Sequence, residues 1–314
     1  MMEKKFLTYD QQIEKLQKEK QLTISDVPAA IHMLEHISYY SLIGGYKDLF
    51  KHKPSGKYLH GVTFEEIVAF YYFDEGLRNL FLKYILQVER HLKSLISYHF
   101  CEKFGENQTE YLNPANFNSA KKNQRAVGRL IHSMQNCISM SSHYNYITHY
   151  SRHYNNVPLW VAMNAVTFGQ LSAFYQYMPN EVQVKVSKYF PGYTEKQLHQ
   201  FITIIAKCRN VCAHGERLYD FRTYDTIPDT LLHRKLSIPL KKGSYMLGKH
   251  DLFAVVLSLK YLISNDDFKD FKRRLSKLIK QVLKQCPHIT RTQLLKEMGF
   301  PENWEKINRY KLFM

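Results

Sequence analysis

The sequence predicts an all-α protein, because helical periodicity runs through most of the chain and signals for strands are few. From residue 64 to residue 100 apolar residues recur at three- and four-residue steps, the spacing that lines one face of a helix. Hydrophobic residues make up 45% of the 314 residues and aromatic residues 14%, so the chain can bury a core and does not resemble a disordered protein. Extended structure is expected only at 235–247, around a Lys-Lys-Gly turn.

Capping residues predict where several helices begin. Pro28 suits the first turn of a helix, with Asp26 or Ser25 as the preceding cap. Thr63 and Glu66 form a capping box ahead of the 64–100 helix, in which each side chain accepts a hydrogen bond from a backbone N–H. Later helices are expected to begin at the pairs Asn180–Gln183, Thr194–Gln197 and Thr290–Gln293, and at Asn265.

Two helices are expected toward the C-terminus. Residues 252–263 are apolar on all sides, which predicts a helix buried in the core. The helix at 266–285 combines an apolar stripe with basic flanks, so it should pack on the body with its lysines outward. Lys272 and Arg273 on that basic face are candidates for contacts with RNA phosphates. The stripe comprises Phe268, Phe271, Leu275, Leu278 and Val282.

The charge of the chain predicts a polyanionic partner. Forty-four Lys and Arg residues face 28 Asp and Glu residues, giving a net charge of +16, and such a field attracts nucleic acid first and an anionic membrane second. No Cys-x-x-Cys pair, secretion signal or apolar run of about 20 residues is present. We therefore expect a cytoplasmic protein with no metal, no cofactor and no membrane association.

The segment 201–220, FITIIAKCRNVCAHGERLYD, carries the most chemistry. If it is one helix, Arg209, Asn210, His214 and Arg217 share the face opposite the apolar side chains, and the Asn210 amide can orient the His214 ring. Arginine can neutralise charge on a phosphate during reaction, and histidine can move a proton to or from an oxygen. Spacing alone favours the plainer interpretation, an amphipathic helix with a solvated polar face.

Four sequence blocks resemble a known family. RNVCAHGERLYD at 209–220 is similar to a segment of the abortive-infection (Abi) proteins of the AbiD/AbiF type, and it fits the Arg-x4-His motif of the HEPN superfamily of α-helical nucleases. The other three blocks are ISYYSLIGGYKDLF at 37–50, VPLWVAMNAVTFGQLSAFYQYM at 157–178 and MGFPENW at 298–304. Together they span most of the chain in the order of the family.

The resemblance implies a HEPN-like helical bundle with helical additions at both ends. It further implies a metal-independent endoribonuclease of a phage-defence system, with Arg209, Asn210 and His214 as catalytic residues. Because the chain has one such motif, a homodimer with a composite site is expected, and a regulatory non-coding RNA is a further expected partner. The predicted parts are an N-terminal helical segment at 1–62, a HEPN-like domain at 63–263 and a C-terminal basic segment at 264–314.

Additional RNA contacts are predicted beside the motif. Relatives often place a polar residue opposite the motif helix, and Glu89, Arg90 and His91 of the long helix are candidates, although they also suit a solvated charge cluster. Arg217 suits either a phosphate or the carbonyl end of the helix.

The segment 141–155 is a weaker candidate site. It interleaves tyrosines with Arg152, which suits unpaired RNA bases, although the pattern favours a polar surface loop. A metal site at His149 and His153 lacks a third ligand. The alternative to a nuclease is a non-catalytic RNA-binding or scaffold protein on the same helical fold.

Overall fold

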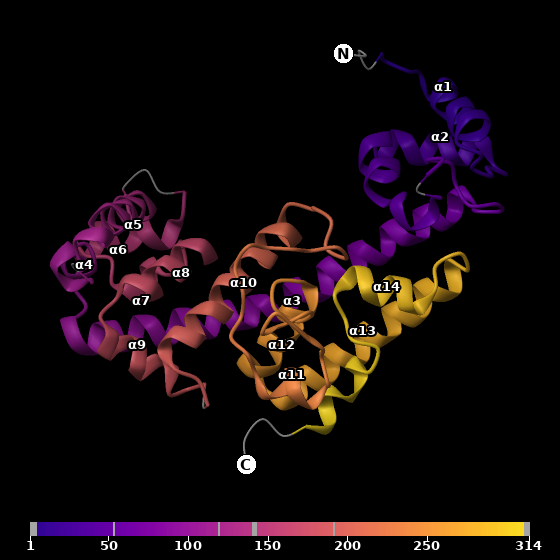
Figure 1. The fold of residues 1–314 in the computed structure, drawn as a ribbon. Coiled ribbons are helices and arrows are strands. Elements are labelled where there is room, and N and C mark those ends of the chain that lie inside the picture. The colour runs from indigo at the N-terminus through magenta and orange to yellow at the C-terminus, as the bar shows by residue number, and fades with distance from the viewer. Residues whose placement is uncertain (1–4, 53, 119, 140–142, 191, 311–314) are drawn as a thin grey trace.

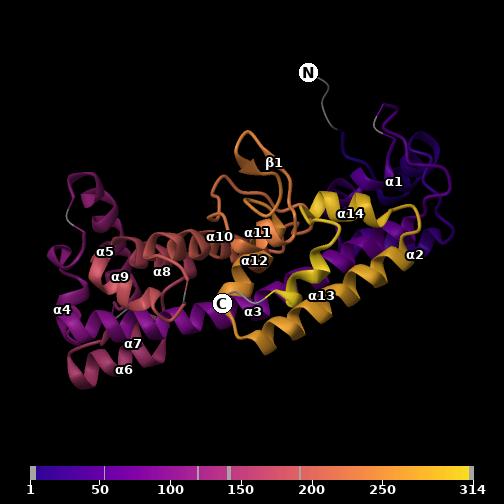
Figure 2. The ribbon, with the colours of Figure 1, turned by 60° about the horizontal axis from the view of Figure 1, so that its bottom comes forward.

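The computed structural model describes residues 5–52, 54–118, 120–139, 143–190 and 192–310 of the chain. It is built around α3 (Phe64–Phe104), a helix of 41 residues that is about 60 Å long. Figures 1 and 2 show α3 running through an elongated molecule, with the other helices packed along it and at its ends. The predicted all-α class is confirmed.

The other elements form three groups along α3. The N-terminal group comprises α1 (Tyr9–Glu14), a π-helical turn (Lys15–Glu19), α2 (Val27–His36), a second π-helical turn (Tyr40–Gly44) and a 3-10 turn (Asp48–Phe50). Around the C-terminal end of α3 lie α4 (Gln108–Tyr111), 3-10 turns at Pro114–Asn116 and Lys121–Asn123, α5 (Gln124–Cys137), α6 (Asn145–Tyr154), α7 (Leu159–Ala162), α8 (Phe168–Tyr177) and α9 (Asn180–Ser187). The third group comprises α10 (Glu195–Ala213), α11 (Leu231–Lys235), β1 (Leu240–Lys241), β2 (Ser244–Tyr245), α12 (Leu252–Leu262), α13 (Asn265–Gln285), α14 (Arg291–Met298) and a 3-10 helix (Trp304–Arg309).

The predicted beginning of α3 is confirmed in detail. The Thr63 hydroxyl accepts a hydrogen bond from the backbone N–H of Glu66, and the Glu66 carboxylate accepts one from the N–H of Thr63, both at 3.3 Å. Capping boxes at Thr194 and Thr290 are confirmed in the same way, and Asp26 caps α2. A Thr followed three residues later by Glu or Gln therefore marks the beginning of a helix reliably in this chain.

Two predicted caps are wrong. Pro179, not Asn180, precedes α9, because the Gln183 side chain donates to backbone carbonyls at the end of α8 instead of reaching back to the start of α9. Ser264, not Asn265, caps α13, because its hydroxyl is placed to accept a hydrogen bond from the N–H of Asp267. Both errors displace the helix start by one residue.

The C-terminal helices pack as predicted, with one change. Every residue of α12 is buried, and the expected extended segment forms the β1–β2 hairpin, in which Leu240 pairs with Tyr245. Along α13 the buried stripe contains Ile279 in place of Leu278, which is only partly buried beside Gly76 of α3. The buried apolar side chains of the described residues form one connected core. The division at residues 63 and 264 stays a prediction.

Candidate functional site

The helix that carries the Arg-x4-His motif ends earlier than the sequence predicts. α10 stops at Ala213, and His214 occupies its C-cap position with a φ of −91°. Gly215 has a φ of +69°, and the next residue, Glu216, donates a backbone hydrogen bond to Val211 at 3.1 Å, an arrangement that closes a helix. Glycine adopts this left-handed conformation without steric cost, so Gly215 breaks the helix directly after the motif.

Arg209 is fixed by a buried carboxylate of α3. Its Nε lies 3.8 Å from Oε2 of Glu89, and the Glu89 side chain is only 7% exposed. Lys93 binds the other oxygen of Glu89 at 2.9 Å. The Arg209 Nε and the Glu89 Oε2 are both buried and neither has a hydrogen-bond partner among the described residues, so charge attraction rather than a directional bond holds the arginine. The Arg209 side chain is still 30% exposed, so its guanidinium can reach a ligand.

Asn210 and His214 lie on the surface at the end of α10. Both residues are exposed, and neither side chain makes a hydrogen bond within the described part of the chain. The expected orientation of the His214 ring by the Asn210 amide is therefore not present; the two residues are joined through the backbone, where the N–H of His214 donates to the carbonyl of Asn210 at 3.0 Å. The structure thus brings Arg209 to Glu89 and leaves the amide and the imidazole open to solvent.

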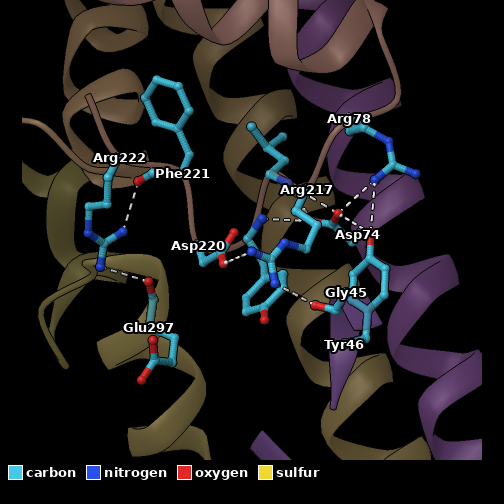
Figure 3. Close-up of polar contacts among 11 residues, drawn as sticks. Gly45, Tyr46, Asp74, Arg78, Arg217, Asp220, Phe221, Arg222 and Glu297 are labelled. Atoms are coloured by element: carbon cyan, nitrogen blue, oxygen red, sulfur yellow. Dashed lines mark hydrogen bonds and ion pairs between the residues drawn. The ribbon is translucent and has the colours of Figure 1, made fainter. Parts of the chain in front are cut away.

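Arg217 lies away from the motif face, contrary to the single-helix prediction. Because the chain turns at Gly215, Arg217 folds onto the N-terminal group, where its Nη1 donates to the carbonyl of Gly45 at 2.7 Å and its Nη2 lies 3.3 Å from Asp220 (Figure 3). Its aliphatic stem approaches so closely that a Cβ added at Gly45 would lie 3.4 Å from the Arg217 Cδ. The carbonyl it binds belongs to the N-terminal group and not to the end of α10.

A buried polar cluster anchors the chain that leaves the motif. Asp74 of α3 accepts hydrogen bonds from the backbone N–H groups of Leu218 and Tyr219, at 3.1 and 2.7 Å, and from the hydroxyl of Tyr46 at 2.8 Å. Arg78, one turn along α3, donates to the same carboxylate at 2.6 Å (Figure 3). Burial raises the pKa of Asp74, whereas Tyr46, Arg78 and the two backbone N–H groups lower it. This cluster joins three separate parts of the chain.

A groove of about 940 Å³ lies between the N-terminal group and the segment that follows the motif. We call it the Tyr40 groove. One wall comes from residues 36–46 together with Tyr71 of α3, and the other from Val211 and residues 215–222. Arg209, Asn210 and His214 do not line this groove, but its second wall begins at Gly215, the residue directly after His214.

The other candidates on α3 point in different directions. Arg90 is exposed, and His91 packs against Phe190 with 5.4 Å between the ring centres, where burial lowers the pKa of its imidazole. Only Glu89 of the three therefore faces α10. Arg152 is exposed on α6, which lies at the far end of the molecule in both ribbon views (Figures 1 and 2).

Lys272 and Arg273 line a second groove, of about 790 Å³, between α13 and the 3-10 helix Trp304–Arg309. We call it the basic groove. Arg273 pairs with Asp270, whereas no ion pair is found within the described residues for Lys272. The charged residues that line the basic groove are Lys269, Lys272, Arg273, Lys277, Lys280, Glu302, Glu305, Lys306 and Arg309. The excess of cations makes it a surface for polyanions.

Neither a cluster of metal ligands nor a helix that could span a membrane is found in the part of the chain that the structure describes. His149 and His153 of α6 lie with their ring centres 4.5 Å apart, but no group of three or more His, Cys, Asp or Glu side chains suited to a metal occurs among the described residues. Ser141 and Ser142, at the start of the tyrosine-rich segment, lie outside the described residues. Among the described helices, none is both long and apolar enough to cross a bilayer.

Sequence analysis missed the role of the Asp74 cluster. Asp74 and Arg78 stand one helical turn apart on α3, and such a pair of opposite charges is a signal for an ion pair. Tyr46 lies in the family block at 37–50, and nothing in that block indicates a contact with Asp74. The partners of Asp74 at 218 and 219 are 144 and 145 residues away, a separation that local patterns do not reveal.

The fold and the site define a class: a helical protein that presents an arginine, an amide and an imidazole at the exposed end of one long helix. A family model described as Abi-like protein matches residues 32–220, and the chain belongs to this family. Membership indicates a role in abortive infection, a defence against phage. The match includes the blocks at 37–50, 157–178 and 209–220, but not the block at 298–304. Searches of curated proteins and of solved structures gave no match.

Proposed function

We propose that this protein is a metal-independent endoribonuclease of the HEPN type, which acts as a homodimer in phage defence. One observation carries the proposal: Arg209, Asn210 and His214 stand together at the end of α10, with the arginine held by Glu89 and the other two side chains free to meet a ligand. The net charge of +16 supports a polyanionic substrate. The Abi-like family supports a role in defence.

The residues suit cleavage by the 2′-hydroxyl of the RNA itself. The 2′-oxygen attacks the adjacent phosphorus and loses its proton, the bond to the 5′-oxygen breaks, and that oxygen takes up a proton. The products are a 2′,3′-cyclic phosphate and a 5′-hydroxyl. His214 serves as the group that accepts or donates one of these protons, and Arg209 stabilises the charge that grows on the phosphate oxygens. Asn210 contacts the phosphate.

The chemistry favours two copies of the chain at one site. In a concerted cleavage one group accepts a proton while another donates one, and a single imidazole does not do both at once. Within the described residues His214 has no titratable partner at hydrogen-bond distance. A second copy that brings its own α10 end to the same phosphate would supply the second imidazole and a second arginine. The need for a second proton-transfer group therefore supports the composite site.

Purified wild-type protein should cleave single-stranded RNA in EDTA and leave cyclic phosphate ends. His214→Ala and Arg209→Ala should each lose at least about 100-fold in rate while keeping the helical circular-dichroism spectrum. His132→Ala, which removes an exposed histidine of α5, is the matched control and should cleave as wild type does. Wild-type rates in the folded His214 and Arg209 variants would refute the proposal.

A mixing experiment tests the dimer. If each phosphate is cut with one imidazole from each copy, adding an excess of His214→Ala protein to wild type should suppress cleavage, because the mixed dimers contain a single imidazole. Sedimentation should give twice the mass of the 37.3 kDa chain. A monomer that cleaves RNA at the wild-type rate would contradict the composite site.

The basic groove supports a second candidate, an RNA-binding protein without catalysis. Seven Lys and Arg side chains line this groove and two Glu side chains accompany them, which suits a phosphate backbone. In that case His214→Ala and Arg209→Ala would retain a tight, salt-sensitive RNA complex, and no cleavage product would form with any variant. Sequencing of RNA that copurifies with His214→Ala protein would identify the ligand under either proposal.

A further inference from the structure

Hydrogen bonds and an ion pair within the protein hold the walls of the Tyr40 groove in place. The Arg217 guanidinium is bound on one side by the Gly45 carbonyl at 2.7 Å and on the other by the Asp220 carboxylate at 3.3 Å. Asp74 accepts a hydrogen bond from the backbone N–H of Leu218, the residue that directly follows Arg217. The walls are therefore set before a ligand enters.

Tyr40 contributes an exposed aromatic ring to this groove. The residue is 84% exposed, although its ring is as large as those that fill the core. It begins the π-helical turn Tyr40–Gly44, a rare geometry that often occurs at functional sites. A Cβ added at Gly44 would lie 3.5 Å from the Tyr40 Cδ2, so the ring packs over this glycine and leaves its other face to solvent.

The charges in the groove nearly cancel. Arg217 and Arg222 both line it, but each guanidinium already donates to backbone carbonyls, of Gly45 in one case and of Phe221 and Glu297 in the other. Asp220, next to Arg217, and Glu216 add two negative charges, which balance the two guanidinium charges. A free phosphate would bind weakly in this groove, because both guanidinium groups are already hydrogen-bonded and a carboxylate lies beside one of them. A flat, uncharged ring with polar edges fits better, because it can stack on Tyr40 or on the guanidinium plane and bond at its edge.

The position of the groove connects it with the motif. One of its walls begins at Gly215, the residue after His214, and includes Val211, the residue after Asn210. The groove wall is therefore continuous with the backbone that carries Asn210 and His214. The volume of about 940 Å³ lies within the range of small-molecule sites and leaves room for one nucleotide with its solvent.

We propose that the Tyr40 groove binds one unpaired nucleobase of the RNA, next to the phosphate that is cut, and thereby sets the sequence preference of cleavage. This inference rests on the proposed ribonuclease function. The base stacks on Tyr40, and Asp220 and the exposed part of Arg217 meet its polar edge. The phosphate of the same nucleotide extends toward His214.

Photocrosslinking tests binding without cleavage. The probe is a random single-stranded ten-nucleotide RNA that carries 4-thiouridine and 2′-fluoro riboses, which lack the attacking hydroxyl. Crosslinks should map to residues 36–46 or 215–222, and they should be lost in Tyr40→Ala and kept in Tyr40→Phe, which retains the ring. Tyr98→Ala, which removes a tyrosine of α3 that is 62% exposed, is the matched control. Crosslinks that map elsewhere would overturn the proposal.

Competition separates a base from an anion. Uridine 5′-monophosphate should displace the crosslinking probe, whereas ribose 5-phosphate and inorganic phosphate should not. Displacement by inorganic phosphate alone would show an anion site and would overturn the proposal.

Cleavage kinetics supply an independent readout. Tyr40→Ala should raise the KM for cleavable RNA by about 5- to 100-fold, the range expected for losing one base–aromatic stack, with little change in kcat. The nucleotide preference on one side of the cut should also weaken. An unchanged cut-site profile in Tyr40→Ala would refute the groove while leaving the ribonuclease proposal intact. If wild-type protein cleaves no RNA but the 2′-fluoro probe still crosslinks near Tyr40, the ribonuclease proposal fails and the groove stands.

Discussion

Replacing Asp74 with Asn tests whether the buried cluster beneath the motif stabilises the fold. The Asp74 side chain is completely buried, and it accepts hydrogen bonds from Arg78, Tyr46, Leu218 and Tyr219. Asparagine keeps the shape of the side chain but removes its negative charge. It also places an NH₂ group where an oxygen accepts hydrogen bonds, so at least one donor loses its partner.

The loss of stability expected for Asp74→Asn follows from the burial of Arg78, which is only 6% exposed. Removing one member of a buried ion pair costs about 3–5 kcal/mol, because the remaining charge stays out of water without compensation. Each buried donor left without an acceptor costs about 1–3 kcal/mol, and the cost of breaking the ion pair already includes part of that loss. We expect Asp74→Asn to lower the free energy of unfolding by about 3–5 kcal/mol, a large part of the 5–15 kcal/mol usual for a folded domain.

Urea unfolding followed by circular dichroism gives the measurement, on wild type, Asp74→Asn, Arg78→Met and the double variant. The double variant should lose less than the sum of the single losses, by at least about 2 kcal/mol, because it leaves no unpaired charge. Glu14→Gln, which breaks an exposed pair with Lys18, is the control and should unfold as wild type does. Single losses below about 1 kcal/mol, or strictly additive losses, would refute this account of the cluster.

Three further changes have expected outcomes. Gly299→Ala should lower the free energy of unfolding by about 2–3 kcal/mol in urea, since Gly299 has a φ of +76° and an added Cβ would lie 2.5 Å from the Asp251 Cγ; wild-type stability would contradict this. Glu89→Gln should reduce the rate of RNA cleavage about tenfold by releasing Arg209, and an unchanged kcat would exclude a positioning role. Burial lowers the pKa of His233, so the unfolded chain takes up the proton first as the pH falls. The contribution of neutral His233 to the free energy of unfolding is present above pH 6.5 and declines below it, by at most about 1.4 kcal/mol per pH unit. In urea titrations at pH 5.5 and 6.5, His233→Asn should show a smaller loss of stability at the lower pH than wild type does. An equal loss in both proteins would contradict this role of His233.

Local sequence patterns predicted the helices because the groups that start a helix lie within one turn of each other. The Thr63–Glu66 box and the apolar stripe that follows it are set by neighbours in the chain, and α3 begins where they predict. The one-residue errors at α9 and α13 have a different cause. The Gln183 side chain donates to a carbonyl at the end of α8 rather than capping its own helix. At α13 the Ser264 hydroxyl, and not the neighbouring Asn265 amide, accepts the hydrogen bond that caps the helix.

The candidate site was predicted only in part. The end of α10 does carry Arg209, Asn210 and His214 together. The prediction that Arg217 shares their helix face is wrong, because the chain turns away at Gly215. A single glycine can sit inside a helix or end it; here it ends the helix, and Asp74 binds the backbone of the chain that follows, at 218 and 219. That contact joins residues far apart in sequence, and residue spacing carries no information about it.

The Asp74 cluster also explains why family blocks far from the motif belong with it. The block at 37–50 supplies the Tyr46 hydroxyl, which donates to Asp74, and the Gly45 carbonyl, which holds Arg217. Both contacts secure the chain directly after His214, although neither residue touches the motif face. The exposed imidazole therefore stands at a helix end whose exit is tied to α3 and to the N-terminal group. If the proposed ribonuclease function holds, RNA that meets His214 encounters a fixed backbone there, which is the condition for placing a proton-transfer group accurately against a phosphate.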